Sequence, residues 1–311
     1  MKKLISITGS CYNEEGNIEE LYNRCKTVLE KHPQYDYEFV LADNCSTDGT
    51  RDVMRRIAAQ DSNFKVIFNA RNYGHIRSPF NALLNAKGDA IVPMCTDLQE
   101  PPEVIEEFIQ KWEEGFKVVV GVRSSSDNGF FLDMFRNLYY WLLRKFAPDE
   151  QLIPRFTGFG MYDRQFIEAL KKYHDPYPYF RGLVSEIGLA RAEVPFVQEK
   201  RKHGRTKNNW FTLYDMAMTG FVNHTKLPLR LATFSGFIIA FLSFLVAIFY
   251  FSYKLCHWAS FELGLAPLVI GVFLLAGIQL IFLGVIGEYI GAIWTQVKNK
   301  PLVIEEERIN M

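Results

Sequence analysis

Three acidic clusters in the first hundred residues each follow a short apolar run, and their residue types suit the binding of a phosphorylated ligand. CYNEEGN holds Glu14 and Glu15, LADNCSTDGT holds Asp43, and PMCTDLQEPPE holds Asp97. A carboxylate can accept hydrogen bonds from a ribose or a base edge. One carboxylate together with substrate phosphates can also hold Mg²⁺ or Mn²⁺. The clusters therefore suit nucleotide and metal binding.

Each cluster also has a purely structural interpretation. Carboxylates favour a helix N-terminus, so Glu14 and Glu15 could simply begin a helix. Ser46 or Asp48 can cap the helix that follows the second cluster. A capped turn explains residues 46–50 but does not explain Asp43. The three clusters are thus more informative together than singly.

Short runs rich in β-branched and aromatic residues alternate with helical patterns through the first 125 residues. The runs predict strands at 4–8, 37–42, 64–68, 90–94 and 117–122. The segments between them predict helices at 18–31, 50–59, 78–86 and 102–114. Repeated strand–helix units predict an α/β fold with a mostly parallel sheet. Ligands bind such sheets at the carboxyl ends of the strands, where the acidic clusters fall.

Two long apolar runs follow in the last third of the chain. Residues 231–253 carry no charge, and residues 266–293 carry one, Glu288. A helix rises about 1.5 Å per residue, so either run can cross a hydrocarbon core of roughly 30 Å. The sequence therefore predicts a head joined to a two-helix transmembrane hairpin.

Flanking charges predict the orientation of that hairpin. Lys226 and Arg230 precede the first run, and Lys298 and Lys300 follow the second. The segment between the runs carries one basic residue, Lys254. The positive-inside bias therefore predicts a multi-pass protein of the inner (cytoplasmic) membrane, with the head and both termini in the cytoplasm.

Composition excludes some classes of partner. The 311 residues include 35 basic and 35 acidic side chains, which argues against a nucleic-acid protein driven by bulk electrostatics. Five cysteines, odd in number and without CxxC spacing, suit reduced thiols better than a disulfide framework.

A helical pattern with two unlike faces covers residues 208–226. It predicts an amphipathic helix in the membrane interface, although a core-facing helix of the head would show the same pattern. We accordingly expect four parts. They are a cytoplasmic head at 1–207, the interfacial helix and linker at 208–230, the hairpin at 231–295 and a cytoplasmic tail at 296–311.

The three clusters, in this order and at these separations, resemble the family 2 glycosyltransferases. Within that family the chain is most similar to the polyprenyl-phosphate glycosyltransferases, the group of dolichol-phosphate mannose synthase and bactoprenol glucosyltransferase. The likeness continues through RNYGHIRSPFNALLNAKGDA, DLQEPPE, FRGL, KLPLRL and GEYIGAIWTQVKNKPL, and so covers nearly the whole chain. It implies a GT-A type nucleotide-diphospho-sugar transferase domain.

Carried over by position, the resemblance assigns roles to the acidic clusters. It makes Tyr12, Glu14 and Asp43 contacts to the nucleotide, and Arg71 a contact to the diphosphate. It makes Asp97 the ligand of Mg²⁺ or Mn²⁺. Asp97 would thus serve both donor binding and catalysis.

The resemblance also assigns a set of basic residues to the acceptor. Arg123 and Arg136 match arginines that hold a lipid phosphate. A basic loop that approaches both phosphates would contain Arg201, Lys202, Arg205 and Lys207. The same loop could instead be a charge cluster for anionic headgroups, and the two roles are compatible.

Three positions depart from the family pattern. Ser10 replaces a usual proline, Cys95 replaces the first carboxylate of the Asp-any-Asp metal motif, and Gly158 replaces an acidic residue. The acceptor of this family is a phosphate monoester whose second pKa is about 6, so it is largely a dianion at neutral pH. Such a nucleophile needs positioning and charge balance more than deprotonation.

The resemblance therefore implies inverting transfer of one sugar from a nucleotide-sugar donor to polyprenyl (undecaprenyl or dolichyl) phosphate at the cytoplasmic membrane face. The product would be a polyprenyl-phospho-sugar for glycan or lipid modification, with Asp97, Arg123 and Arg136 in catalytic roles. A catalytically silent membrane-anchored scaffold is one alternative. A processive polysaccharide synthase is another, although it would need more spans and a QxxRW-type motif. The two-helix anchor could also pack with copies of itself.

Overall fold

A computed structural model describes residues 2–124, 153–173, 175–199, 227–256, 265–298 and 300–311. The chain divides into two compact units. One comprises Met1–Met216 with Lys298–Met311, and the other comprises Ala217–Val297. We call them the head and the hairpin. The predicted interfacial helix at 208–226 lies outside the described residues.

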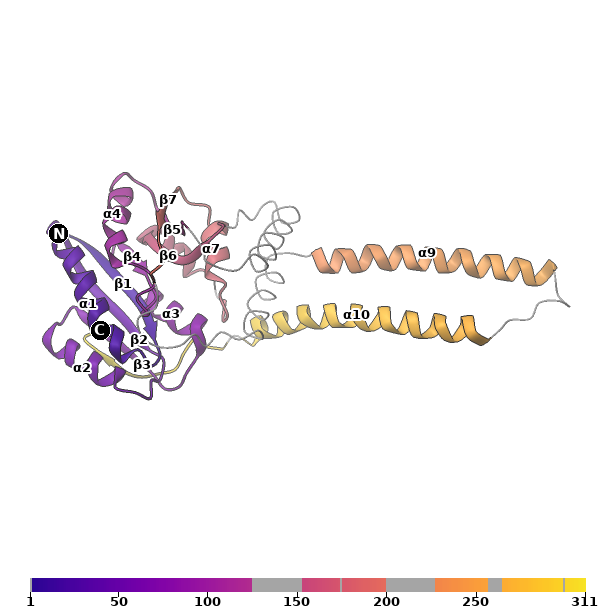
Figure 1. Ribbon diagram of the computed structural model, residues 1–311, viewed down its shortest axis with the longest axis horizontal. Helices are drawn as coiled ribbons and strands as arrows, with labels where there is room; N and C mark the ends of the chain where they lie inside the picture. Colours follow the sequence, from indigo (N-terminus) through magenta and orange to yellow (C-terminus); the bar gives the residue numbers. More distant parts are fainter. Residues whose placement is uncertain (1, 125–152, 174, 200–226, 257–264, 299) are drawn as a thin grey trace. The chain divides into compact units, whose positions relative to one another are not determined.

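The described part of the head is built on an eight-stranded sheet in the order β7-β5-β6-β4-β1-β2-β3-β8 (Figure 1). Pairs β1–β2, β1–β4, β2–β3 and β5–β7 are parallel, whereas β6 is antiparallel to β4 and β5 and β8 is antiparallel to β3. The strands are β1 (Lys3–Cys11), β2 (Tyr35–Asp43), β3 (Phe64–Asn69), β4 (Ala90–Pro93), β5 (Val118–Arg123), β6 (Phe156–Asp163), β7 (Arg191–Phe196) and β8 (Glu305–Ile309). The predicted mostly parallel sheet is therefore confirmed.

Helices cover the sheet on both faces (Figure 1). They are α1 (Glu15–Glu30), α2 (Thr50–Gln60), α3 (Gly74–Asn85), α4 (Ile105–Glu113), α6 (Arg164–Leu170) and α7 (Phe180–Glu186). A 3₁₀ turn at Pro102–Val104 leads into α4. Along α4 the buried residues Ile105, Phe108, Ile109 and Trp112 recur at helical spacing, so one stripe of the helix faces the sheet.

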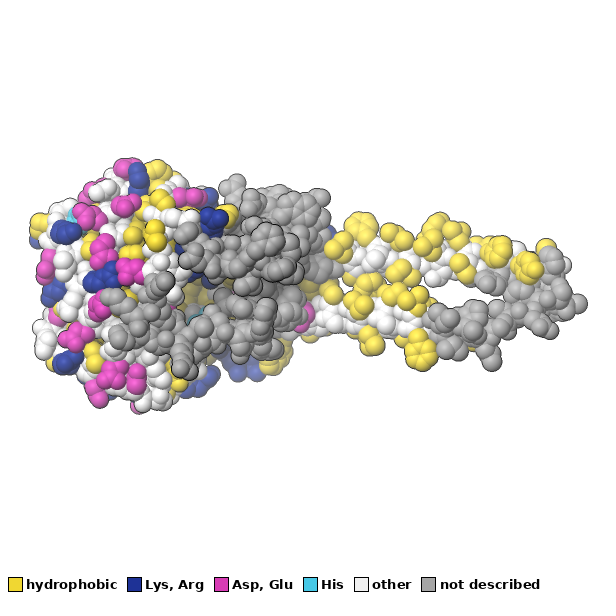
Figure 2. Space-filling model, in the orientation of Figure 1, with side chains coloured by type: hydrophobic (Ala, Val, Ile, Leu, Met, Phe, Trp, Pro, Cys, Tyr) yellow, Lys and Arg dark blue, Asp and Glu magenta, His cyan; other side chains and the backbone are white. Residues whose placement is uncertain are grey.

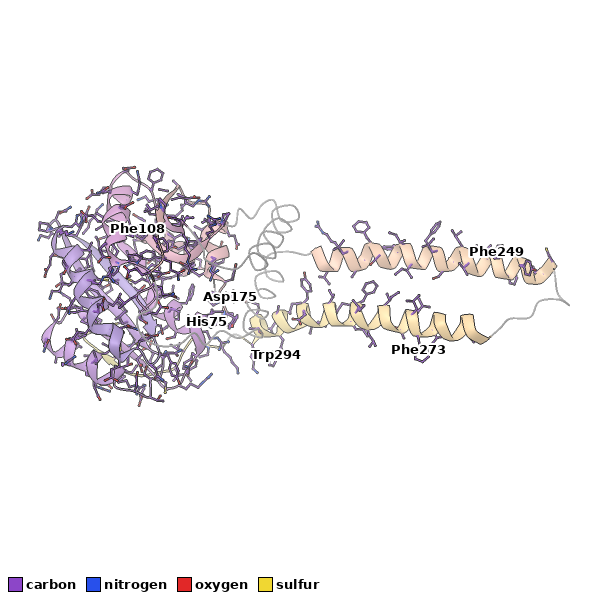
Figure 3. All side chains as sticks on the ribbon, viewed as in Figure 1. His75, Phe108, Asp175, Phe249, Phe273 and Trp294 are labelled. Carbon is purple, nitrogen blue, oxygen red and sulfur yellow. The ribbon has the colours of Figure 1, made fainter. Side chains whose placement is uncertain are left out.

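The two faces of the sheet bury separate cores, because successive side chains of a strand point to opposite faces. In β2, Phe39 and Leu41 join the core under α1, α2 and α4, whereas Val40 and Ala42 join the core under α3, α6 and α7. The Phe108 and Phe159 rings lie 4.9 Å apart between centroids in the first core (Figure 3). This double burial explains why the central strands read as nearly continuous apolar runs.

The C-terminal segment contributes a strand that the sequence analysis did not anticipate. Residues 296–311 were expected to form a tail, but Glu305–Ile309 forms β8 and pairs with the edge strand β3. The side chain of Asn310 donates to the carbonyls of Ala58 at 2.8 Å and Phe64 at 3.0 Å, which fastens the strand beyond its end. The head therefore contains residues from both sides of the hairpin in the sequence.

The hairpin contains two long helices, α9 (Leu227–Cys256) and α10 (Leu265–Val297). By length and composition both can cross a membrane, with mean hydropathies of 2.4 for Leu229–Tyr253 and 2.0 for Gly271–Val297. Hydrophobic side chains such as Phe249 and Phe273 project outward and are exposed along both helices (Figures 2 and 3). The hydroxyls of Thr233 and Ser235 donate to carbonyls four residues earlier, which satisfies them within the helix.

Candidate active site

The residues assigned from the sequence gather at the carboxyl ends of the strands. Asp43 and Arg123 are the last residues of β2 and β5, Tyr12 directly follows β1, and Asp97 lies in the loop after β4. β5 runs parallel to β4, because both are antiparallel to β6. The sheet therefore brings these residues to one edge, as parallel topology requires.

Asp43 is completely buried, and its carboxylate is bound by protein donors. Arg51 in α2 donates from Nε to Oδ2 of Asp43 at 2.7 Å. The backbone N–H of Ser46 lies 3.2 Å from both carboxylate oxygens. A buried carboxylate is costly unless it is paired in this way. Sequence reasoning found Asp43 but missed Arg51, because an arginine in the first turn of a helix carries no local signal of its partner.

The loops after β1 and β2 are fastened to each other by hydrogen bonds. The backbone N–H of Asn13 donates to the Ser46 hydroxyl at 3.0 Å, and that of Thr47 donates to Oδ1 of Asn13 at 2.8 Å. The backbone N–H of Glu14 donates to the Thr50 hydroxyl at 2.9 Å. Asn13 adopts a φ of +59°, a left-handed conformation that asparagine tolerates. These bonds fix the backbone on which Tyr12 and Glu14 stand.

The carboxylate of Glu14 is part of the start of α1. Its Oε2 accepts a hydrogen bond from the side chain of Asn17 at 2.5 Å. Both Glu14 and Tyr12 are partly exposed. Glu14 therefore fits both interpretations from the sequence. It stabilises the start of α1, and it also lies at the strand edge where a nucleotide would bind.

Arg71 follows β3 and is exposed. Its guanidinium lies over the Tyr73 ring, 4.1 Å from the centroid, and Nη1 donates to the carbonyl of Asn72 at 3.2 Å. The loop that holds it is tied to β2, because the amide oxygen of Asn44 accepts from the Tyr73 N–H at 2.8 Å. The backbone of the loop that carries Arg71 is thus held in place, and the guanidinium of Arg71 is exposed at the surface.

Asp97 is 8% exposed and lies in a tight loop after β4. Its Oδ1 accepts from the backbone N–H of Gln99 at 3.2 Å, and Leu98 between them has a φ of +60°. The Thr96 hydroxyl donates to the carbonyl of Ser10 at 3.3 Å, which ties the loop to the end of β1. The backbone therefore sets the direction of the Asp97 carboxylate.

Glu100, which the sequence analysis did not single out, joins two loops at the site. Its Oε2 accepts from the backbone N–H of Cys95 and its Oε1 from the Thr157 hydroxyl, both at 2.8 Å. The side chain is 3% exposed, and burial raises the pKa of Glu100. No local pattern in DLQEPPE distinguishes this buried carboxylate from its exposed neighbours, so only the fold could reveal it.

Cys95 is a poor substitute for a metal-binding carboxylate. The nearby Glu100 carboxylate raises the pKa of the Cys95 thiol well above its ordinary value, so the side chain stays protonated at neutral pH. Metals bind the thiolate rather than the thiol. In the described part of the chain no group of three or more His, Cys, Asp and Glu residues could hold a metal ion. Of the two side chains in this motif, Asp97 is the better suited to a divalent metal ion, and its role as a ligand stays a prediction.

Arg123 is half-buried at the end of β5, and its Nε has no hydrogen-bond partner among the described residues. Burial and the positive charge of Arg181 lower the pKa of Arg123, while Glu100 opposes the shift. Arg181 lies in α7, within the FRGL segment, and was not assigned from the sequence. The guanidinium groups of Arg123 and Arg181 thus lie near two carboxylates, those of Glu100 and Asp97, and the Arg123 Nε is the donor in this group that an anionic ligand could engage.

The remaining predicted acceptor residues lie outside the described part of the chain. They are Arg136, Arg201, Lys202, Arg205 and Lys207. Their roles stay predictions.

Comparison with known proteins identifies the family. The profile described as Glycosyl transferase family 2 matches residues 6–171, from β1 to the residue after α6. The chain belongs to this family.

Relatives extend the likeness beyond the matched domain. The uncharacterized glycosyltransferase YkcC of Bacillus subtilis is 34% identical over 304 residues, which cover 97% of this chain and 93% of YkcC. The SfII prophage-derived bactoprenol glucosyl transferase of Shigella flexneri is 30% identical over 300 residues, 96% of each chain. A mycobacterial protein of known crystal structure shares the fold with a TM-score of 0.50, at 20% identity over 70% of this chain and 72% of its own.

This family 2 glycosyltransferase has the GT-A type α/β fold, and its departure at Gly158 has a backbone cause. Gly158 adopts a φ of +108°, which residues with a side chain rarely adopt, and a Cβ there would touch the Phe180 ring at 3.4 Å. A carboxylate at this position would therefore require a different local backbone.

Proposed function

We propose that this glycosyltransferase moves one sugar from a nucleotide-diphospho-sugar to polyprenyl phosphate at the cytoplasmic membrane face. The observation that carries the proposal is the likeness to a bactoprenol glucosyl transferase over 96% of both chains. That span includes α9 and α10 as well as the head, so the shared part exceeds what nucleotide-sugar binding alone requires.

In the proposed reaction an oxygen of the acceptor phosphate forms a bond to the anomeric carbon of the donor sugar. The bond from that carbon to the nucleoside diphosphate breaks, and the diphosphate leaves with the electron pair. Attack from the side opposite the leaving group inverts the anomeric carbon. The acceptor is largely a dianion at neutral pH, so no proton has to be removed first.

The donor would lie over the ends of β1, β2 and β3. Tyr12 and Glu14 would contact the nucleotide from the loop after β1, and Asp43 from the end of β2. Arg71 would reach the diphosphate with the guanidinium that it exposes beside Tyr73. These loops are already bound to each other, so little order has to be gained when the donor binds.

The residues present fit a divalent metal ion with one protein carboxylate. Asp97 would hold Mg²⁺ or Mn²⁺, since Mg²⁺ is often bound through one or two carboxylates together with substrate phosphates. Such an ion supplies charge stabilisation for the leaving diphosphate. The bonds made by Thr96 and Gln99 hold the loop that carries Asp97, and this order supports the proposed role of the carboxylate.

Arg123 would hold the acceptor phosphate and thereby orient the attacking oxygen. Its half-buried guanidinium has an Nε without a partner among the described residues, and a phosphate oxygen would satisfy it. Arg136 and the basic loop with Arg201, Lys202, Arg205 and Lys207 would complete the acceptor site. The absence of an acidic side chain at Gly158 fits a reaction in which the acceptor attacks without a protein base.

The proposed orientation places the head in the cytoplasm with α9 and α10 across the membrane. Because β8 follows α10 and pairs with β3, a chain that crosses the membrane through α9 must return through α10. Two single-cysteine variants test this, one that keeps Cys256 and one that carries Asp36→Cys at an exposed position of the head. An impermeant maleimide should label Cys256 in intact cells and the Asp36→Cys variant only after permeabilisation, and the reverse pattern would overturn the orientation.

The direct test of function uses membranes that contain the full-length protein. They would be incubated with polyprenyl phosphate and each of a panel of radiolabelled nucleotide sugars, followed by organic extraction. One donor should give an extractable product that requires the polyprenyl phosphate and is absent with Asp97→Ala. A polymer that stays at the origin would favour a processive synthase. No product with any donor would favour the silent scaffold.

A further inference from the structure

Arg51 connects the buried carboxylate of the donor site to the C-terminal strand. Its Nε donates to Asp43 at 2.7 Å, its Nη1 to Oε2 of Glu306 in β8 at 3.0 Å, and its Nη2 to the carbonyl of Asn69 at 3.0 Å. Each of the three guanidinium nitrogens thus donates a hydrogen bond to a different segment of the chain. A lysine could not reproduce this arrangement, because its charge sits on a single nitrogen without the planar fork.

The bond from Arg51 sets the position of the Asp43 carboxylate. Asp43 is fully buried, and apart from Arg51 its described contact is the long, shared bond from the Ser46 N–H at 3.2 Å. The short charge-assisted bond to Arg51 is therefore the stronger restraint on the carboxylate. Whatever fixes the plane of the guanidinium therefore also fixes the Asp43 carboxylate and, through the Ser46 N–H, the loop after β2 that would border the nucleotide.

β8 provides one of the restraints on that plane. Glu306 pairs with Arg51 across a sequence separation of 255 residues, next to the pairing of β8 with β3. Its side chain is 56% exposed and that of Arg51 is 23% exposed, so the pair can be altered without opening the core. A neighbouring pair, Arg55 with Glu307, also joins α2 to β8 but makes no described contact with Asp43.

We propose that Arg51 is a positioning residue through which the docked C-terminal strand holds Asp43 ready for the donor. The inference rests on the proposed function, which assigns Asp43 to the nucleotide. Donor binding and docking of β8 are then coupled, and the coupling is reciprocal because binding free energies are linked. Nucleotide should strengthen the docking of β8, and weaker docking at Glu306 should weaken nucleotide binding.

The test compares two substitutions one residue apart on the same strand. Glu306→Gln removes the negative partner of Arg51, and Glu307→Gln removes that of Arg55 and serves as the matched control. Full-length protein in detergent would be titrated with UDP and, separately, with GDP in the presence of Mn²⁺. For the nucleotide that binds, Glu306→Gln should raise the Kd about threefold, the range of an exposed ion pair. Glu307→Gln should change it much less, because Glu307 makes its described hydrogen bonds to Arg55 and acts on Arg51 only through charge.

Arg51→Lys extends the series toward the site. It should raise the Kd about tenfold or more, since it removes the geometry of a charge-assisted bond as well as the link to β8. In turnover experiments all of the loss should appear in the donor KM, with kcat retained at saturating donor. Hydrogen exchange supplies a second readout, because nucleotide should slow exchange of the β8 amides in the unmodified protein and slow it less in Glu306→Gln.

The outcomes separate the inference from the function on which it rests. Equal Kd values for the unmodified protein and Glu306→Gln would overturn the inference alone. Equal weakening by Glu306→Gln and Glu307→Gln, with matching losses in melting temperature, would also overturn it, because docking would then act only through stability. If the unmodified protein bound neither nucleotide, the proposed function would fail and the inference with it.

Discussion

The two halves of the strand edge differ in how the charged residue at the end of a strand is paired. In the donor half, formed by the loops after β1, β2 and β3, Asp43 at the end of β2 is paired with Arg51, and Asn13 and Asn44 bind neighbouring loops. In the acceptor half, formed by the ends of β4 and β5 and the start of β6, Arg123 keeps an Nε without a described partner. The same half buries Glu100, whose pKa is raised.

This difference indicates which contribution to the binding free energy dominates in each half. The loops of the donor half are tied together before the ligand arrives, so binding costs little ordering entropy. The acceptor half offers a guanidinium donor that has no partner among the described residues, and it gains most when an anion enters, because the low-dielectric surroundings strengthen the new interaction. Substitutions in the two halves should therefore affect different kinetic constants.

The largest effect is expected at the boundary between the halves. Asp97→Ala should lower lipid-linked product formation about a thousandfold or more, since it removes the carboxylate proposed to hold the metal ion. EDTA should do the same to the unmodified protein. Asp36→Ala is a matched control, because Asp36 is exposed near the start of β2, at the opposite edge of the sheet. Full activity in EDTA would remove the metal from the mechanism.

A pair of conservative substitutions should then separate the halves. Arg123→Lys should raise the KM for polyprenyl phosphate about ten- to a hundredfold and leave the donor KM nearly unchanged. Arg71→Lys should show the opposite pattern, with its loss confined to the donor KM. The measurement is initial rates with each substrate varied at a saturating level of the other. If both variants raised the same KM, the division into two halves would be wrong.

The smallest effect concerns the stability of the acceptor half. Burial raises the pKa of Glu100 in the folded protein above its value in the unfolded chain. The contribution of Glu100 to the free energy of unfolding is therefore complete below the pKa of the unfolded chain, and it is lost as the pH rises through the pKa of the folded protein. Glu100→Gln removes this dependence. Between pH 5 and pH 8 the melting temperature of the unmodified protein in detergent should fall by about 2–4 °C more than that of the variant.

Glu103→Gln is the control for that measurement. The bond to Arg24 lowers the pKa of Glu103, so its contribution is present above the ordinary glutamate pKa and is complete throughout pH 5–8. Its substitution should shift the melting temperature equally at both pH values. A similar pH dependence in the unmodified protein and Glu100→Gln would mean that Glu100 does not titrate in this range.

The sequence could predict the fold through the first 125 residues, where burial imposes a period, but β6, β7, α6 and α7 were not predicted. The five predicted strands and four predicted helices are present, with ends that move by a few residues, because both faces of the central strands are buried. β8 could not be predicted in this way. Its sequence, EEERI, is almost wholly charged, and it becomes a strand through β3 and the arginines of α2, which lie more than two hundred residues earlier.

The same distinction applies to the site. Asp43 and Asp97 could be predicted because each follows an apolar strand, and the structure brings both to one edge. Arg51, Glu100 and Arg181 could not, since each acts through partners that are distant in sequence or buried only by the fold. The proposed chemistry of the predicted residues thus depends on neighbours that no local pattern identifies.

The place of β8 in the chain also sets an order of events during synthesis. β3 is made early, but its partner is translated only after α9 and α10. Until residues 305–309 emerge, β3 presents an open edge that can pair with another chain. The hairpin is therefore made before the sheet can be closed. If α9 and α10 cross the membrane as proposed, a chain in which only one of them crosses leaves β8 on the far side, so completion of the head would report that both helices have inserted.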